Sequence, residues 1–194
     1  MNRLPHLHQN SVRLYLCRHG ETHANAKRLI QGAGINSKLT AIGVHQADSL
    51  ASAFQENVQL GRIVSSNLIR ATQTARPLLS VMDNDEPTFV QQYTDLREMQ
   101  YGDLEGLEIT KNETTVRMRT LWQDWKSDLN VPCPGKNGES MMDLIDRAEN
   151  ILWQIAFDSK TLRSRNVAVV SHSMLLRAVL TKFLIDKEEG EMSS

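Results

Sequence analysis

The sequence has few of the features that mark secreted, membrane-spanning or disulfide-bonded proteins. Only two of its 194 residues are cysteines, Cys17 and Cys133, and their spacing fits neither a disulfide framework nor a metal-ligand motif. No apolar run approaches the roughly 18–20 residues that a membrane-spanning helix needs. We therefore expect a reduced, cytoplasmic protein that does not associate with membranes.

Neither sign of charge predominates, because 22 lysines and arginines are matched by 23 aspartates and glutamates. A protein that holds nucleic acid or an anionic membrane mainly through charge carries a basic excess, so neither partner is expected. Any anion site in this chain must be built from a local cluster of arginines. The sequence also contains no repeats, low-complexity tracts or domain linker, and it does not indicate an oligomeric state.

What the chain does have is an alternation of short apolar runs and amphipathic segments, with 40% hydrophobic residues, enough for one core. This alternation predicts an α/β fold with three layers, a mostly parallel sheet flanked by helices. Strands are expected at 12–17, 61–66, 88–93 and 166–171. Helices are expected after an N-cap at Thr40, over 68–79 with a disturbance at Pro77, within 111–157, and after His172 through about Ile185.

The predicted domain spans residues 12–186. Residues 1–11 are polar and lack the apolar segment of a signal peptide, so a flexible N-terminal tail is expected. Residues 187–194 are expected to form an acidic C-terminal tail. Within 111–157, Trp122 and Trp125 are expected in the core, and a substrate platform is the alternative.

Polar residues recur at the ends of the predicted strands. Arg18 and His19 follow the first strand, Arg70 the second, Glu98 the third and His172 the fourth. Parallel strands bring their carboxyl ends to one edge of the sheet, so these side chains are expected to converge there. Arginine offers planar, permanently charged donors for a phosphate group. The pattern predicts a phosphate site at this edge.

Five sequence blocks resemble the histidine phosphatase superfamily, also called phosphoglycerate mutase-like, in the order that the family has them. The resemblance extends from about Val12 to Ile185. The blocks are Arg18-His19-Gly20-Glu21-Thr22 with Asn25 and Gln31-Gly32, then residues 65–75, 96–106, 138–140 and 170–173. At Ser173 the sequence departs from the glycine that often follows the second histidine in the family.

The resemblance implies a phosphomonoester hydrolase that works through a phosphohistidine on a small phosphorylated metabolite, without metal or other cofactor. His19 would be the nucleophile and Glu98 the proton donor and acceptor, while Arg18, Arg70 and His172 would surround the phosphoryl oxygens. The substrate-binding residues would be Arg18, Asn25, Gln31, Gly32, Arg70, Glu98 and Ser173. Residues 111–157 would be a helical insertion that shapes the substrate pocket.

Several alternatives remain at this point. Glu21, Asp103 and Glu105 are other carboxylates near the predicted acid. The resemblance favours the phosphatase branch, but a phosphoglycerate mutase-type transfer and a non-catalytic protein that binds phosphorylated ligands are also open. A zinc site at His19 and His23 is not expected, since Gly20 stands where an H-E-x-x-H motif has its glutamate.

Overall fold

The computed structural model describes residues 8, 11–82, 89–161 and 165–192. The strands are β1 (Arg13–Arg18), β2 (Arg62–Ser66), β3 (Gln91–Tyr93) and β4 (Asn166–Ser171). The α-helices are α1 (His23–Ala26), α2 (Ala41–Asn57), α3 (Ile69–Ala75), α4 (Asn112–Ser127), α5 (Met141–Thr161) and α6 (Ser173–Met192). Three 3₁₀ helices are η1 (Arg76–Val81), η2 (Thr94–Leu96) and η3 (Gly102–Leu104).

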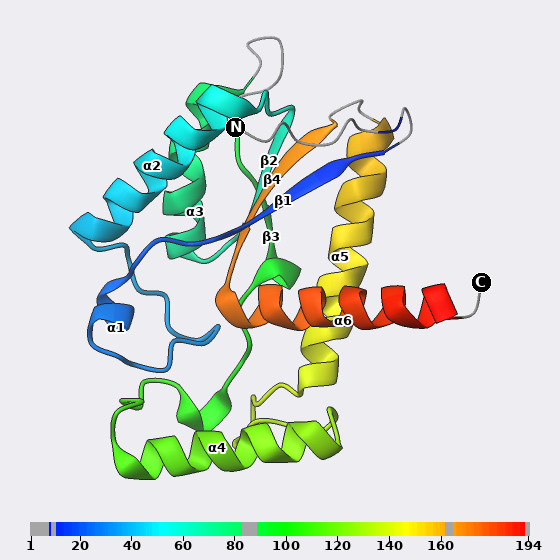
Figure 1. The fold of residues 1–194 in the computed structure, drawn as a ribbon. Helices are drawn as coiled ribbons and strands as arrows, with labels where there is room; N and C mark the ends of the chain where they lie inside the picture. Colours follow the sequence, from blue (N-terminus) through cyan, green and yellow to red (C-terminus); the bar gives the residue numbers. More distant parts are fainter. Residues whose placement is uncertain (1–7, 9–10, 83–88, 162–164, 193–194) are drawn as a thin grey trace.

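The strands form one parallel sheet in the order β1-β4-β2-β3 (Figure 1). In the central strand β4, Val167 and Val169 pack with α5 and α6, whereas Ala168 and Val170 pack with α2, α3 and η1. Both faces of the strand are thus apolar, as parallel sheets require when helices cover them on both sides. The predicted three-layer α/β fold is confirmed.

The local signals that predicted the helix ends have the expected hydrogen bonds. Thr40 caps α2, since its hydroxyl accepts from the backbone N–H of Gly43 at 3.1 Å. At the start of α5, the Ser140 hydroxyl accepts from the Asp143 N–H at 3.1 Å, and the Asp143 carboxylate accepts from the Ser140 N–H at 3.0 Å. The α-helix before Pro77 ends at Ala75 and continues as η1.

Two predicted boundaries need correction. The third strand is shorter than predicted, because β3 begins only at Gln91; Thr88 lies outside the described residues. The final helix does not end near Ile185 but continues to Met192, so the expected tail from 187 is helical as far as that residue. Lysine, glutamate and methionine are good helix formers, and they outweigh the single Gly190 in this stretch.

Of the expected N-terminal tail, only His8 and Ser11 lie within the described residues. The backbone carbonyl of His8 accepts hydrogen bonds from Ser11 N–H at 3.0 Å and from the Arg165 guanidinium at 2.7 Å. The His8 carbonyl therefore lies beside Arg165, the residue that precedes β4. In the described part of the chain, no helix is long and apolar enough to cross a membrane.

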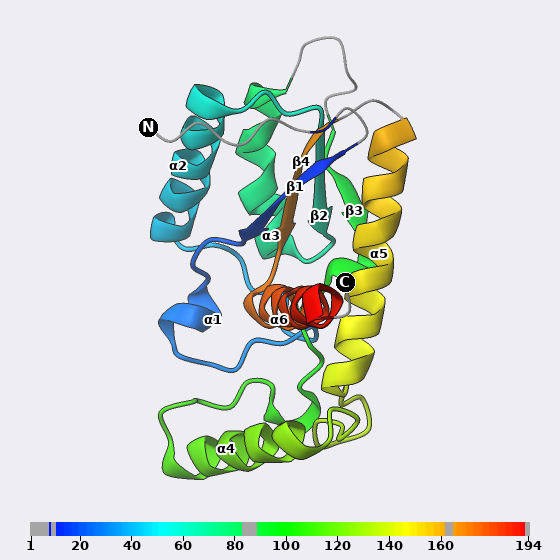
Figure 2. The same cartoon turned by 45° about the vertical axis from the view of Figure 1, so that its right-hand side comes forward.

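The carboxyl ends of the strands point toward the part of the molecule that holds α1, η2, η3 and the N-terminus of α6 (Figures 1 and 2). Helix α4 lies beyond this edge in both views. Helices α2 and α3 cover one face of the sheet, and α5 lies on the other. The fold thus brings the segments that follow β1, β2, β3 and β4 to one place.

Candidate active site

His19 directly follows β1 and is held by its own backbone and by a neighbouring helix. Its N–H donates to the carbonyl of Ser171 at 3.0 Å, and the next N–H, that of Gly20, donates to the Thr74 hydroxyl at 3.0 Å. The ring atom Nδ1 lies 2.7 Å from the Gly20 carbonyl oxygen. A carbonyl only accepts, so Nδ1 carries the proton and Nε2 has a free lone pair.

Arg70 and His172 form the second part of the cluster. Arg70 is fully buried in the first turn of α3, and its Nε donates to Nδ1 of His172 at 3.2 Å. Its two terminal nitrogens donate to the carbonyls of Ile35 at 2.8 Å and Gly32 at 3.1 Å. These bonds fix the guanidinium plane. The ring centroids of His19 and His172 lie 5.1 Å apart.

The hydrogen bond from Arg70 also sets the tautomer of His172. Because Nδ1 accepts, the neutral ring carries its proton on Nε2. That Nε2 is a buried side-chain atom without a hydrogen-bond partner among the described residues. Buried donors are almost always paired, and unpaired ones tend to mark ligand sites. The cluster therefore offers an N–H donor suited to an anion.

Burial sets the charge state of this cluster. It lowers the pKa of His19 to about 4, and the charges of Arg70 and Arg18 act in the same direction. The pKa of His172 is also lowered well below its ordinary value, first by burial and then by Arg70. Burial lowers the pKa of Arg70 to about 10, which leaves it charged at neutral pH. At pH 7 the cluster holds two neutral imidazoles beside a buried cation.

Glu98 lies between η2 and η3 and is also buried, with 5% exposure. One carboxylate oxygen accepts from the N–H groups of Met99 at 3.0 Å and Leu175 at 3.2 Å; the other accepts from Met174 at 3.1 Å. Burial raises the pKa of Glu98, although these three donors and the charge of Arg70 oppose the shift. A carboxyl group with a raised pKa is suited to give and take a proton.

The remaining predicted residues differ in how closely they approach this cluster. Arg18 has an exposed side chain, and its charge lowers the pKa of both histidines. Ser173 is the first residue of α6 and is partly buried. The side chains of Asn25 and Gln31 are engaged with Thr22, whose N–H donates to Asn25 at 3.2 Å and whose hydroxyl donates to Gln31 at 2.6 Å. Their observed contacts organise the loop around α1.

Gly32 stands where the chain passes very close to other groups. A Cβ atom at this position would lie 2.1 Å from a carboxylate oxygen of Glu105 and 2.7 Å from the carbonyl of Met99. Only glycine lets the backbone approach this closely while its carbonyl holds Arg70. Glu105, whose pKa is raised by burial, accepts from Gly34 N–H at 2.9 Å and Tyr101 N–H at 3.2 Å.

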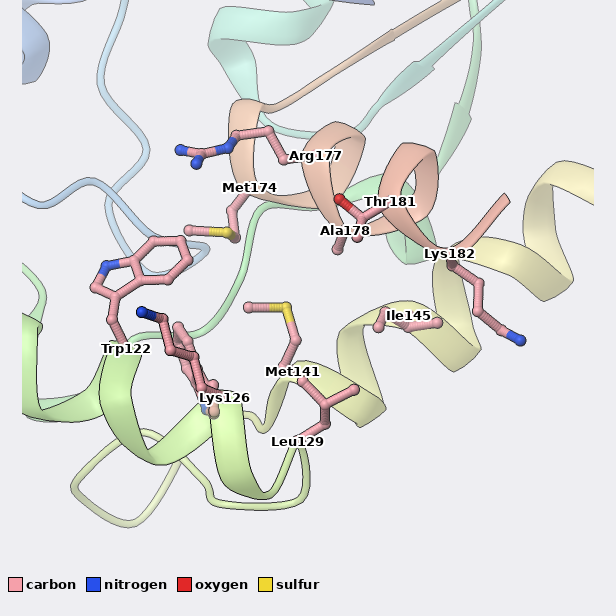
Figure 3. A pocket seen from close by; sticks show the side chains of 11 residues that line it. Trp122, Lys126, Leu129, Met141, Ile145, Met174, Arg177, Ala178, Thr181 and Lys182 are labelled. Carbon is pink, nitrogen blue, oxygen red and sulfur yellow. The ribbon is translucent and has the colours of Figure 1, made fainter. Parts of the chain in front are cut away.

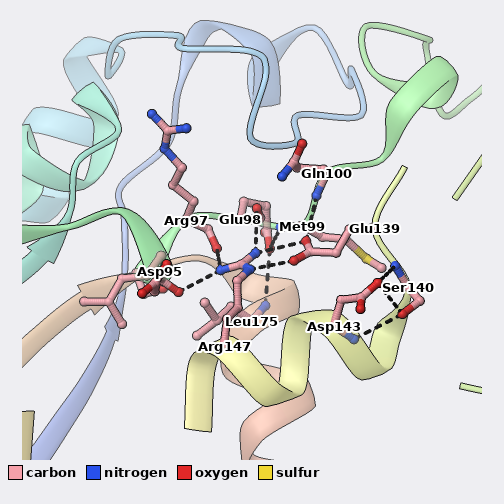
Figure 4. Close-up of polar contacts among 12 residues, drawn as sticks. Asp95, Arg97, Glu98, Met99, Gln100, Glu139, Ser140, Asp143, Arg147 and Leu175 are labelled. Carbon is pink, nitrogen blue, oxygen red and sulfur yellow. Dashed lines mark hydrogen bonds and ion pairs between the residues drawn. The ribbon is translucent and has the colours of Figure 1, made fainter. Parts of the chain in front are cut away.

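An ion pair that the sequence did not reveal supports the segment around Glu98 (Figure 4). Arg147, on α5, donates to both oxygens of Glu139, at 2.6 and 3.0 Å. Its guanidinium also donates to three carbonyl oxygens, those of Asp95 (2.7 Å), Arg97 (2.9 Å) and Glu98 (3.1 Å). Glu139 in turn accepts from Gln100 N–H at 3.1 Å. All five guanidinium N–H groups are thus used to fix this segment.

These contacts lie at the edge of the sheet where the chain was expected to hold a phosphate. Among the described residues, no group of three or more histidine, cysteine, aspartate or glutamate side chains is placed to hold a metal ion. A profile of the histidine phosphatase superfamily (branch 1) matches residues 14–193. The chain belongs to this superfamily. The resemblance found in the sequence is confirmed.

Relatives of this histidine phosphatase carry several activities in their names. The match to fructose-2,6-bisphosphatase TIGAR of Xenopus laevis is 42% identical over 93 residues, which are 48% of this chain and only 34% of that protein. The metal-independent phosphoserine phosphatase of Arabidopsis thaliana is 32% identical, over 92% of this chain and 71% of that protein. Proteins named as phosphoglycerate mutases match as well.

The solved structure of the α-ribazole phosphatase from Shigella flexneri has a TM-score of 0.63 and 30% sequence identity, covering 84% of this chain and 75% of that one. The fold of this histidine phosphatase is therefore that of its relatives, and its phosphatase-named neighbours agree with the predicted branch. Their names differ in substrate, so the substrate must be argued from this chain.

The ion pair of Arg147 leads to a prediction for the histidine phosphatase. Arg147→Lys keeps the charge but cannot reproduce five fixed donors. We expect kcat to fall about 10- to 100-fold, because the backbone that carries Glu98 loses its support, while KM changes less than threefold. Steady-state kinetics with a phosphomonoester measure both. Arg119→Lys, at an exposed position of α4, is the matched control.

A purely structural role for Arg147 would lower the melting temperature without changing the activity of the molecules that stay folded. The pH dependence of kcat/KM separates the two cases. Activity is expected to fall at alkaline pH as Glu98 loses its proton. If Arg147 positions Glu98, this alkaline limb of the profile shifts in Arg147→Lys. An unshifted limb with unchanged kcat would contradict the positioning role.

Proposed function

We propose that this histidine phosphatase hydrolyses the phosphate ester of a small metabolite in two steps, through a phosphohistidine at His19. The supporting observation is the buried cluster of His19, Arg70 and His172, in which hydrogen bonds set both tautomers. His19 presents a lone pair on Nε2, and His172 presents an unpartnered N–H on its own Nε2. A nucleophile and a hydrogen-bond donor suited to an anion therefore lie side by side.

In the first step, Nε2 of His19 attacks phosphorus and the bond to the ester oxygen breaks. Arg70, His172 and Arg18 bind the three equatorial phosphoryl oxygens, where negative charge is concentrated in a loose transition state. Backbone and side-chain groups of Gly32, Asn25, Gln31 and Ser173 complete the proposed substrate site. Glu98 gives its proton to the departing oxygen, which leaves as an alcohol.

In the second step, water takes the place of the alcohol. Glu98, now ionised, accepts a proton from the water as its oxygen attacks the phosphohistidine. Inorganic phosphate leaves, and His19 and the protonated Glu98 are restored. The neutral state of His19 supports this scheme, because a protonated imidazole has no lone pair with which to attack.

A phosphoglycerate mutase-type reaction uses the same first step but returns the phosphoryl group to a second hydroxyl, so it must exclude water. A non-catalytic binding protein would lack the nucleophile or the acid, and both are present here at His19 and Glu98.

A cytoplasmic location stays a prediction, supported by two cysteines that are both unpaired. The substrate class is a small phosphorylated metabolite.

Rapid-quench labelling tests the proposal. We expect a phosphomonoester labelled with ³²P to give an acid-labile, base-stable phosphoenzyme within one turnover, followed by stoichiometric release of inorganic phosphate. Transfer of the label to 3-phosphoglycerate in place of water would identify a mutase. Steady turnover without any acid-labile phosphoenzyme would contradict the proposed mechanism, and absence of turnover with all phosphomonoesters in a broad panel would favour the binding protein.

A further inference from the structure

A cavity lies between α4, α5 and α6, lined by none of the four residues His19, Arg70, Glu98 and His172 (Figure 3). Its volume is about 380 Å³. Cavities of roughly 300–1,000 Å³ hold small organic ligands, so this one is large enough for a fused pair of aromatic rings. The residues that give it its character are Trp122, Lys126, Met141, Met174, Arg177 and Lys182.

The walls of this cavity are apolar and polarisable. Trp122 and Trp125 contact each other edge to face, with ring centroids 5.5 Å apart. Trp125 is buried and its indole N–H donates to the Val131 carbonyl at 2.8 Å, whereas Trp122 is only partly buried. Met141 and Met174 add two thioethers between α4 and α6 (Figure 3). Sulfur and indole surfaces both favour contact with an aromatic ring.

The charged side chains of the lining all have the same sign. Lys126, Arg177 and Lys182 line the cavity, and no carboxylate does. The guanidinium of Arg177 lies 5.4 Å from the Trp122 ring centroid, so a cation lies beside the aromatic wall. This contrasts with the chain as a whole, whose formal net charge is −1. The local excess of cations selects an anion.

We infer that this cavity, named here the α4–α6 pocket, binds an aromatic anion: a ring system against Trp122 and the two methionines, with a carboxylate, sulfonate or phosphate near Arg177 and Lys126. The ligand has two possible sources. It is either the leaving-group half of an extended substrate or a separate small molecule. The pocket adjoins the candidate active site, which allows both sources, since Met174 lines the pocket and the Met174 N–H donates to Glu98.

Binding of naphthalene-2-sulfonate, measured by isothermal titration calorimetry, tests the inference without reference to turnover. We expect 2-naphthalenemethanol, which lacks the charge, and methanesulfonate, which lacks the rings, each to bind at least about tenfold more weakly. Arg177→Gln and Lys126→Gln are expected to weaken sulfonate binding about three- to tenfold. Arg119→Gln removes a cation from the same helix outside the pocket and serves as the matched control.

Ala178→Leu is the second kind of variant, because it fills the pocket with apolar atoms from α6 and removes no contact. It is expected to abolish sulfonate binding while the melting temperature is retained. Unchanged binding in Ala178→Leu, equal affinity for the sulfonate and the alcohol, or no detectable binding to the wild type would each overturn the inference. These outcomes are independent of phosphohistidine formation, so the proposed activity stands or falls separately.

Kinetics then separate the two sources of the ligand. If the pocket receives the leaving group, Ala178→Leu raises KM for 2-naphthyl phosphate about tenfold and leaves KM for glycerol 2-phosphate unchanged, and the sulfonate competes with the naphthyl ester. If the ligand is a separate molecule, both KM values stay unchanged while sulfonate binding is lost. Either result supports the pocket as an aromatic-anion site.

Discussion

Replacing His19 with glutamine is expected to reduce kcat by about four orders of magnitude or more and to abolish the acid-labile phosphoenzyme. Glutamine is close to histidine in length and places its amide where the ring has Nε2, so only the bond from Nδ1 to the Gly20 carbonyl is lost. It has no nitrogen lone pair able to form a covalent bond to phosphorus. The substitution therefore removes the nucleophile while it preserves most of the local packing.

The matched control is His23→Gln, four residues later and exposed at the start of α1. It should retain wild-type activity. Because Arg70 and His172 are untouched in His19→Gln, that variant should still bind inorganic phosphate, as measured by calorimetry, and should show a similar melting temperature. If His19→Gln kept more than about a tenth of wild-type activity, another nucleophile would have to be sought.

The residues that converge around His19 could be predicted from the sequence because they depend on the geometry of the sheet. Arg70, Glu98 and His172 each follow a strand, and β1, β2, β3 and β4 are parallel. A parallel sheet brings those ends to one edge whatever the loops between them do. The alternation of apolar runs and amphipathic segments likewise predicted which segments along the chain form strands and which form helices.

The supporting contacts could not be predicted in this way. Arg147 lies on α5, and the carbonyls it binds belong to a segment about fifty residues earlier, as shown by the sequence separations of 49, 50 and 52. No periodicity or turn signal links the two. Likewise, Trp122 packs against the core as expected, but it is only partly buried and also borders a cavity, where α4 lies across the end of the sheet (Figure 2).

The end of α6 shows how a local signal can be outweighed. The polar composition after Ile185 predicted the end of the helix and an acidic tail, but lysines and glutamates are also good helix formers, and the helix continues to Met192. Composition distinguishes buried from exposed segments better than it distinguishes an exposed helix from an exposed coil. Boundaries on the surface are therefore the weakest part of the prediction.

Replacing Glu98 with glutamine is expected to lower kcat/KM for an alkyl phosphate such as glycerol 2-phosphate about 10²- to 10⁴-fold. An alkoxide is a poor leaving group and needs the proton that Glu98 gives. The loss of kcat/KM for p-nitrophenyl phosphate should be far smaller, since its leaving group is stable without a proton. Steady-state kinetics with the two esters measure this ratio.

The pH profile of kcat/KM gives a second readout. The first step needs Glu98 protonated, and burial raises its pKa, so activity is lost as the pH rises through that value. It also needs His19 neutral, and the pKa of about 4 places the acid limb there and not near 6.5. Glu98→Gln should remove the alkaline limb and leave the acid limb in place.

Glu105→Gln is the decisive comparison, because Glu105 is the other carboxyl group near Arg70 whose pKa is raised by burial. It binds the N–H groups of Gly34 and Tyr101, and so holds the loop of Gly32 and not the start of α6. Its variant should keep the alkaline limb and the ratio between the two esters. If the limb vanished in Glu105→Gln and persisted in Glu98→Gln, the proton donor would be Glu105, and the hydrogen bonds of Glu98 to Met174 and Leu175 would serve only to cap α6.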